Sequence, residues 1–172
     1  KPSPHLLSSI IKYQNKKYKI EDFELETVWH NQIKPKDFEK LNNFFWLFSL
    51  DLKSSKKSVK KVITNWITNN NHFKKESWEF DMTAKRIISC LSNHPLTYDD
   101  NDKEYRLMFD HMIQKQTNHL LNEIKNSKDL ENKIIGCSAI ILTGLCYNIK
   151  KNYLDIGLNF LKKITNSSID NQ

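Results

Sequence analysis

The stretch that decides the fold is Val-Lys-Lys-Val-Ile-Thr-Asn-Trp-Ile, residues 59–67. Its apolar residues stand at positions i, i+3, i+4, i+7 and i+8, which places them on one face of an α-helix. The run Asn69-Asn70-Asn71 follows and predicts the end of this helix. The stretch therefore predicts an amphipathic helix whose apolar stripe faces a core.

The helical period continues on both sides of this stretch. Pro35 suits the first turn of a helix whose apolar residues recur as far as Leu52. After the asparagine run, Ser77 is expected to cap a third helix, which Pro95 ends. We therefore expect one helix before residues 59–67 and another directly after them.

Three further helices are expected in the second half. The acidic cluster at 99–102 is placed to begin a long helix, because negative charge stabilises a helix N-terminus. Residues 130–147 are apolar on nearly every side, which predicts neighbours on more than one face. Gly136, Ser138, Ala139 and Gly144 would let those neighbours approach closely. A sixth helix follows around residues 153–164.

These patterns predict an all-α fold built from antiparallel helical hairpins, because the connections are short. Tyr18–Trp29 alternates with a period of two instead, which indicates an extended segment. The domain organisation is an extended or irregular lead-in with a short helix at 1–34, a helical domain at 35–166 and a polar tail at 167–172. Periodicity leaves open whether the hairpins form a ring or a plain bundle.

The basic charge has two interpretations. A net charge of +7 suits a nucleic-acid or other polyanionic partner. However, Arg86 and Arg106 are the only arginines, and nucleic-acid recognition usually depends on arginine's two-pronged contact. The excess of Lys, Asn and Ile also indicates an AT-rich genome, which raises the charge without any function. We therefore expect no nucleic-acid partner.

The sequence gives little support for a disulfide-bonded, metal-binding or membrane-spanning protein. Cys90, Cys137 and Cys146 lie in helical patterns without metal-site spacing, so buried free thiols and a reducing compartment, cytoplasmic rather than periplasmic, are favoured. The apolar segments are too short to span a membrane. His111 and His119 lie too far apart along one helix to share a metal. We expect no metal, no cofactor and no membrane partner.

An ordered series of motifs carries a resemblance. Leu41-Asn42 precedes Phe45-Trp46-Leu47, and Asn65-Trp66-Ile67 precedes Asn69-Asn70. Trp78 then precedes Arg86-Ile87, and Ser92, His94, Pro95 and Leu96 follow, before Gln116, His119-Leu120 and the small-residue helix at 139–146. In this order the motifs resemble the helical N-terminal region of the heparinase II/III-like polysaccharide lyases, closest to a proteobacterial branch. Cys90 stands where that branch usually has tryptophan, and Lys133 near its arginine.

The resemblance implies a fold and a chemistry. The helices would be part of an incomplete (α/α) toroid, followed by a β-sandwich domain of the same protein. The family's reaction is β-elimination of an acidic, uronate-containing polysaccharide by general acid–base chemistry. Its catalytic His, Asn and Tyr elements would lie beyond Gln172, so we expect no catalytic residue here and no lyase activity from this chain alone.

Three residues are candidates for substrate binding within that resemblance: Trp78, Arg86 and Asn42. An aromatic ring for sugar stacking beside a guanidinium for a carboxylate is a sensible pair. Each also has a structural interpretation, which is the more common one: Trp78 and Arg86 as interhelical anchors, and Asn42 as a bridge at a helix end. The alternative function for the whole chain is a non-catalytic helical scaffold or protein-interaction module.

Overall fold

The chain has an all-α fold, which confirms the expected class. The computed structural model describes residues 10–13, 16–19, 34–50, 56–147 and 152–169. A small antiparallel hairpin of β1 (Ile10–Tyr13) and β2 (Lys16–Lys19) accompanies the helices, with Ile10 opposite Lys19. No larger sheet is present in these residues.

The helices of the described part follow one another with short connections. Their bounds are α2 Pro35–Asn42, the 3-10 helix η3 Phe45–Ser49, α3 Lys56–Asn70, α4 Phe80–Ser92, α5 His94–Thr97, α6 Lys103–Glu123, α7 Leu130–Cys146 and α8 Tyr153–Ile169. Each of the six main helices expected from periodicity is present. The one-turn helix α5, which begins at His94 and contains Pro95, is additional.

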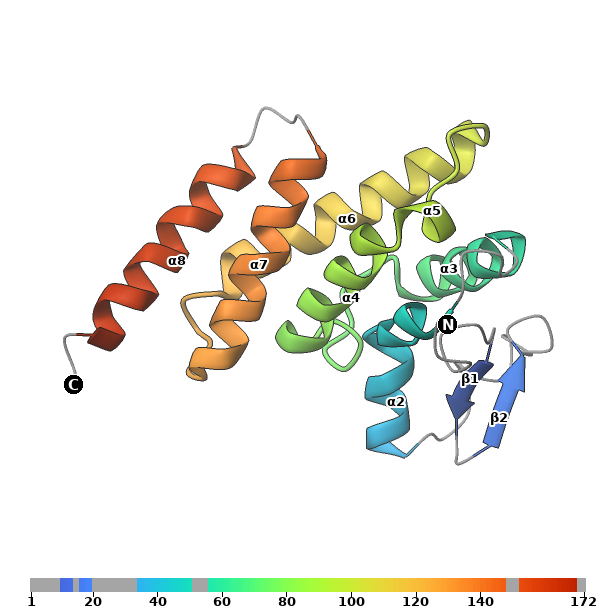
Figure 1. The fold of residues 1–172 in the computed structure, drawn as a ribbon, viewed down its shortest axis with the longest axis horizontal. Helices are drawn as coiled ribbons and strands as arrows, with labels where there is room; N and C mark the ends of the chain where they lie inside the picture. The colour runs from blue at the N-terminus through green and yellow to red at the C-terminus, as the bar shows by residue number, and fades with distance from the viewer. Residues whose placement is uncertain (1–9, 14–15, 20–33, 51–55, 148–151, 170–172) are drawn as a thin grey trace, which may run out of the picture.

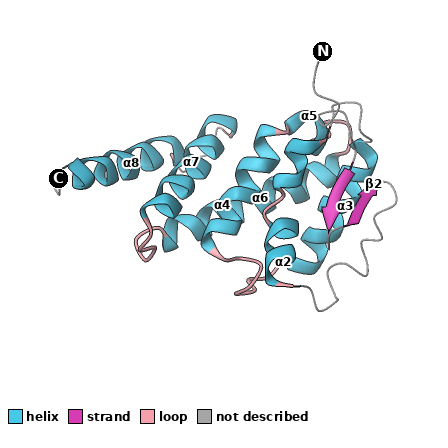
Figure 2. Cartoon of the chain, turned by 60° about the horizontal axis from the view of Figure 1, so that its bottom comes forward, coloured by secondary structure: helices cyan, strands magenta, loops and turns pink. Residues whose placement is uncertain are grey.

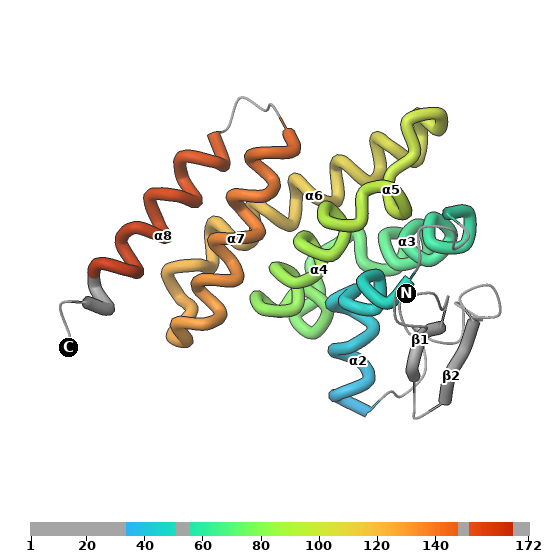
Figure 3. Tube along the Cα trace, viewed as in Figure 1, coloured from blue at the N-terminus to red at the C-terminus, as the bar shows by residue number. Residues whose placement is uncertain are grey.

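Helix α4 lies at the centre of the array and contacts α2, η3, α5, α6 and α7 (Figure 1). Helix α7 packs on α4 on one side and antiparallel to α8 on the other, so that α8 lies at the end opposite the β1–β2 hairpin (Figures 1 and 2). The tube view shows α3 and the start of α6 at one end of the molecule and the red helix α8 at the other (Figure 3). Helix α8 therefore lies at the edge of the array, with α7 as its main neighbour.

The helix that begins at Pro35 is shorter than expected. It ends at Asn42, and Phe44 takes a left-handed conformation with φ of 59° before η3 begins. The side chain of Asn43 accepts a hydrogen bond of 3.0 Å from the main-chain N–H of Phe45, which stabilises this turn against a continuing helix. Phe45 and Phe48 consequently lie 43% and 46% exposed instead of in the core.

The expected start of α4 was wrong by two residues. Glu79, not Ser77, is the N-cap, and its carboxylate accepts a hydrogen bond of 3.0 Å from the N–H of Met82. The acidic start of α6 is confirmed, because Asp102 caps it through the N–H of Tyr105 at 3.0 Å. Ser77 is buried beside the start of α4, and its main-chain oxygen accepts a hydrogen bond from Arg86.

Helix α7 contacts α4, α6 and α8, as its apolar composition predicted. A Cβ at Gly144 would collide with the backbone of Leu154 in α8, and one at Gly136 would collide with the ring of Phe80 in α4. These two glycines therefore allow the close approach of helices on two sides. Ile134, by contrast, is 40% exposed, so one strip of the helix faces solvent.

The two ends of the chain are partly described. Of the expected extended segment Tyr18–Trp29, Tyr18 and Lys19 lie in β2, and the remainder falls outside the described residues, as does most of the lead-in where a short helix was expected. Helix α8 continues to Ile169, so the expected polar tail begins as helix.

Candidate ligand-binding site

Arg86, the leading sequence candidate, is fully buried at the middle of the helical array. Its Nη1 donates to the main-chain oxygen of Asn42 at 2.6 Å, its Nη2 to that of Ser77 at 3.0 Å, and its Nε to Oε1 of Gln116 at 3.0 Å. The guanidinium lies over the ring of Trp66, 4.1 Å from the centroid. Burial lowers the pKa of Arg86 to about 9, yet within the described chain no carboxylate pairs with it.

Asn42 belongs to the same buried cluster. Its Oδ1 accepts a hydrogen bond of 2.8 Å from the indole N–H of Trp66, and its Nδ2 donates 2.9 Å to the main-chain oxygen of Phe38. Because Arg86 uses its main-chain oxygen, Asn42 closes the C-terminus of α2 and connects it to α3 and α4. Asn42 therefore bridges a helix end, which was its structural interpretation.

Trp78 closes the C-terminal end of α3. Its indole N–H donates 3.1 Å to the main-chain oxygen of Asn70, and the side chain is 4% exposed. Its own main-chain oxygen accepts a hydrogen bond of 2.9 Å from Nε2 of His119. Trp78 and Arg86 are connected through the loop before α4, because Arg86 donates a hydrogen bond to the main-chain oxygen of Ser77, the residue before Trp78.

Arg86 is therefore placed as an interhelical anchor and is not exposed for contact with a substrate. The sequence placed Trp78 and Arg86 on one helix, but Trp78 precedes α4, which begins at Phe80. The donors of Arg86 are used to satisfy main-chain oxygens that would otherwise be buried without partners. Asn42, Trp78 and Arg86 thus hold α2, α3, α4 and α6 together and present no open surface to a saccharide.

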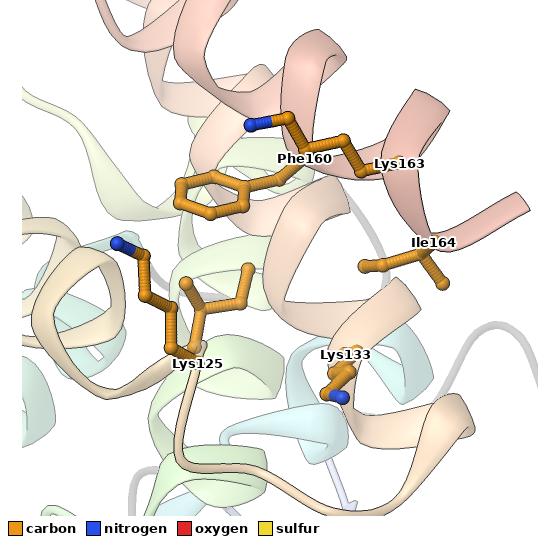
Figure 4. Close-up of a pocket in the computed structure, with 6 residues that line it drawn as sticks. Lys125, Lys133, Phe160, Lys163 and Ile164 are labelled. Atoms are coloured by element: carbon orange, nitrogen blue, oxygen red, sulfur yellow. The ribbon is translucent and has the colours of Figure 1, made fainter. Parts of the chain in front are cut away.

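A hollow of about 380 Å³ lies elsewhere, between the end of α6, the start of α7 and the second half of α8 (Figure 4). Its apolar part is formed by Ile124, Phe160 and Ile164. Its remaining residues are basic: Lys125, Lys133 and Lys163. We call this site the three-lysine pocket.

Lys125 lies in the turn after α6, Lys133 in α7 and Lys163 in α8, so tertiary packing alone brings the three lysines together. Lys125 and Lys163 are exposed, and Lys133 is half-buried. Ion pairs elsewhere use Lys56, Lys60 and Lys85, but among the residues with described positions none pairs Lys125, Lys133 or Lys163 with a carboxylate. The pocket therefore combines uncompensated positive charge with an aromatic ring, which suits an anionic ligand that has an apolar face.

Lys125 and Lys163 are not among the candidate residues that the sequence indicated. One signal was available, because Phe160, Lys163 and Ile164 stand at i, i+3 and i+4 and so share a face of α8. The same arrangement is common on any amphipathic helix. The proximity of Lys125 to α8 could not be inferred from it.

Two of the three cysteines are buried free thiols, as expected, whereas Cys146 is exposed, because it lies on the solvent-facing strip of α7. Burial raises the pKa of Cys90 to about 12 and that of Cys137 to about 11, so both thiols stay protonated. The hydroxyls of Tyr98 and Tyr147 both donate to Asp110, at 3.2 and 2.8 Å. Desolvation and this carboxylate raise the pKa of both phenols.

The described residues also bear on metal sites and membrane spans. No group of His, Cys, Asp and Glu side chains with the arrangement of a metal site occurs there. Nor does any described helix combine the length and apolar character that crossing a bilayer requires. Comparisons with protein-family models, curated proteins and solved structures find no match to the chain.

Proposed function

We propose that this chain is an α-helical domain that binds an acidic, uronate-containing polysaccharide, as the N-terminal helical region of a heparinase II/III-like lyase. The single observation that carries the proposal is the three-lysine pocket, with Phe160 at its apolar side. In this proposal the chain contributes to a binding groove within an incomplete toroid. The elimination chemistry is supplied by residues outside the chain.

The pocket's chemistry matches such a ligand in two respects. A sugar ring has an apolar C–H face that packs on an aromatic ring, and a uronate adds a carboxylate for an ammonium group. Lysines act as point charges without arginine's fixed geometry, so they tolerate several orientations of the carboxylate. Lys133 stands near the position where the resembling branch tends to have arginine, so in this proposal lysine supplies a charged contact there with looser geometry.

Each charged contact is expected to be weak, because an exposed ion pair contributes about 0.2–1 kcal/mol. The three lysines of the pocket, acting together, would therefore supply most of the electrostatic attraction to the polysaccharide. The affinity should fall as salt is added, since the Debye length shortens to about 8 Å at physiological ionic strength. The proposal thus predicts modest, salt-sensitive binding.

The test is titration calorimetry of the chain with a hexuronate hexasaccharide at low and at physiological salt. The double variant Lys125→Glu and Lys163→Glu should abolish binding, because it reverses two charges at the pocket. The matched control is Lys57→Glu with Lys61→Glu, which makes the same charge change on exposed residues of α3. Equal weakening by the two double variants would mean general attraction to a basic surface, and would contradict a specific pocket.

A second candidate, a protein-interaction module, is supported by the exposed apolar residues of α7 and α8. Leu130, Ile134, Leu145 and Leu158 are 46%, 40%, 66% and 47% exposed. Monomeric proteins rarely gather large apolar side chains in one exposed patch without a use for them. Sedimentation analysis of the wild type against Leu145→Ser with Leu158→Ser would reveal self-association through this strip; identical monomer profiles at high concentration would remove that form of the candidate.

A further inference from the structure

We infer that the buried cluster around Arg86 binds one small anion, such as chloride, between the side chains of Ser77 and Gln116. This anion site is separate from the three-lysine pocket and does not depend on the proposed function. It would give a ligand-binding role to residues that also anchor the helices. The features that indicate it are a buried guanidinium without a carboxylate and two buried polar atoms without partners.

Arg86 carries a positive charge in the interior that no described carboxylate balances. Its side chain is fully buried, and the ion pairs among the described residues all use lysine. The groups that accept its hydrogen bonds are neutral: the main-chain oxygens of Asn42 and Ser77, the amide of Gln116 and the hydroxyl of Thr83. A buried charge is costly in free energy unless an opposite charge lies near it. An anion beside this guanidinium would therefore stabilise the fold.

The amide of Gln116 presents an unused donor beside the guanidinium. Its Oε1 accepts a hydrogen bond of 3.0 Å from Nε of Arg86. This bond fixes the orientation of the amide, because the reverse orientation would turn its NH2 group toward the N–H of Arg86. The Nε2 atom is then a buried donor, and it has no hydrogen-bond partner among the described residues. Since buried donors are normally paired, this atom calls for an acceptor.

Ser77 brings a second unpaired atom to the same edge of the guanidinium. Its main-chain oxygen accepts a hydrogen bond of 3.0 Å from Nη2 of Arg86. Because Nη2 and Nε point outward along one edge of this planar group, Ser77 and Gln116 both contact that edge. The Oγ atom of Ser77 is buried without a partner in the described part of the chain, and the residue is 3% exposed. Two unpaired groups that can donate, next to a cation, select a negatively charged acceptor.

The enclosed position limits the size of the ligand. Ser77, Arg86 and Gln116 are all buried, whereas a saccharide or a phosphate ester would need an open groove. A halide ion is close to a water molecule in size and accepts several hydrogen bonds at once. A water molecule could also satisfy the two unpaired atoms, but it would leave the charge of the guanidinium unbalanced. The chemistry therefore favours a halide, with water as the competing outcome.

The first measurement is the melting temperature of the full chain in sodium chloride and in sodium methanesulfonate at equal ionic strength. An anion that binds only the folded chain raises the melting temperature as its concentration increases. At a chloride concentration about ten times the Kd, the rise should be about 3–6 °C. Equal melting temperatures in the two salts at every concentration would overturn the anion site.

Two variants connect the chloride-dependent rise to the cluster. Gln116→Glu should remove the rise, because the new carboxylate supplies the negative charge that the anion would otherwise bring. Ser77→Ala should reduce the rise, since it removes one contact and keeps the main-chain oxygen that binds Arg86. The matched control is Ser138→Ala, at an exposed position of α7, which should keep the full rise.

The second measurement locates the ion in the wild type. In crystals of the full chain grown in bromide, anomalous scattering should place a bromide ion in contact with Nε2 of Gln116 and Oγ of Ser77. The double variant Lys125→Glu and Lys163→Glu should keep the chloride-dependent rise, because these lysines belong to the other site. A rise that this double variant loses, a rise that Gln116→Glu keeps, or a water molecule in place of bromide would each overturn the inference.

Discussion

The Nη1 atom of Arg86 donates a hydrogen bond of 2.6 Å to the main-chain oxygen of Asn42, the last residue of α2. The two residues are 44 positions apart in the sequence. The side chain of Asn42 is at the same time bonded to the indole of Trp66, over whose ring Arg86 lies. The buried guanidinium of Arg86 thus connects α4 with α2 and α3.

Replacing Arg86 with alanine should lower the free energy of unfolding by about 3–5 kcal/mol. The reason is that the main-chain oxygens of Asn42 and Ser77 and Oε1 of Gln116 would be left buried without a donor. Thermal and urea unfolding followed by circular dichroism measures this loss. Arg106→Ala, at the other arginine, is the control and should change stability by less than about 1 kcal/mol. A normally stable Arg86→Ala protein would contradict the anchoring role.

Gln116→Glu should increase stability at neutral pH. The Nε2 atom of Gln116 is buried and has no hydrogen-bond partner among the described residues, while Oε1 accepts from Arg86. A carboxylate would remove the unpaired donor and give the buried guanidinium an opposite charge. We expect a gain of about 1 kcal/mol, measured by urea unfolding. Gln116→Leu, which removes both polar atoms, should destabilise; a glutamate variant as unstable as the leucine variant would mean that desolvation of the new charge outweighs the pairing.

Gly144→Ala should destabilise the packing of α7 on α8. The new Cβ would meet main-chain atoms of Leu154, which cannot rotate away as a flexible side chain would. We expect a cost of about 1–3 kcal/mol in chemical unfolding, in spite of alanine's higher helix propensity. Ser138→Ala, at an exposed position of the same helix, should change stability by no more than about 0.5 kcal/mol. Equal stability of the two variants would show that α8 can move away without cost.

Stability should fall above pH 10 because of Tyr105. Burial raises the pKa of this phenol above its ordinary value of 10.0, and its hydroxyl donates 2.7 Å to the main-chain oxygen of Thr97. Above pH 10 the unfolded chain releases this proton and the folded chain keeps it, so stability decreases with rising pH by about 1.4 kcal/mol per pH unit. Urea unfolding from pH 8 to 11 measures the slope.

The comparison for this prediction is Tyr105→Phe. Other buried phenols, including Tyr147, also lower the free energy of unfolding as the pH rises. The expected result is therefore a difference between the wild type and the variant in the slope of this free energy against pH. The variant should be less stable by about 1 kcal/mol at pH 8, where a hydrogen bond is lost. It should then lose stability more slowly than the wild type above pH 10. Parallel slopes would show that Tyr105 ionises in the folded protein.

By itself, the sequence determined the helical class and the approximate course of each main helix. Val59, Val62, Ile63, Trp66 and Ile67 all lie in the core, because one helical face must be buried once the others are polar. Asp102 began α6 as expected, since capping depends on residues three positions apart. These features are local, so the information for them is contained in neighbouring residues.

Only the tertiary structure decided what Arg86 and Asn42 do. Their residue types fit both a saccharide contact and an interhelical anchor, and the choice depends on which carbonyls lie within hydrogen-bonding distance. The turn at Phe44 likewise required the side chain of Asn43 to compete with a continuing helix. The three-lysine pocket arose in the same way, because Lys125 and Lys163 lie on segments whose proximity depends on how α8 packs on α7. Helix periodicity fixes which face of a helix is apolar, whereas the identity of the residue opposite that face depends on contacts between distant parts of the chain.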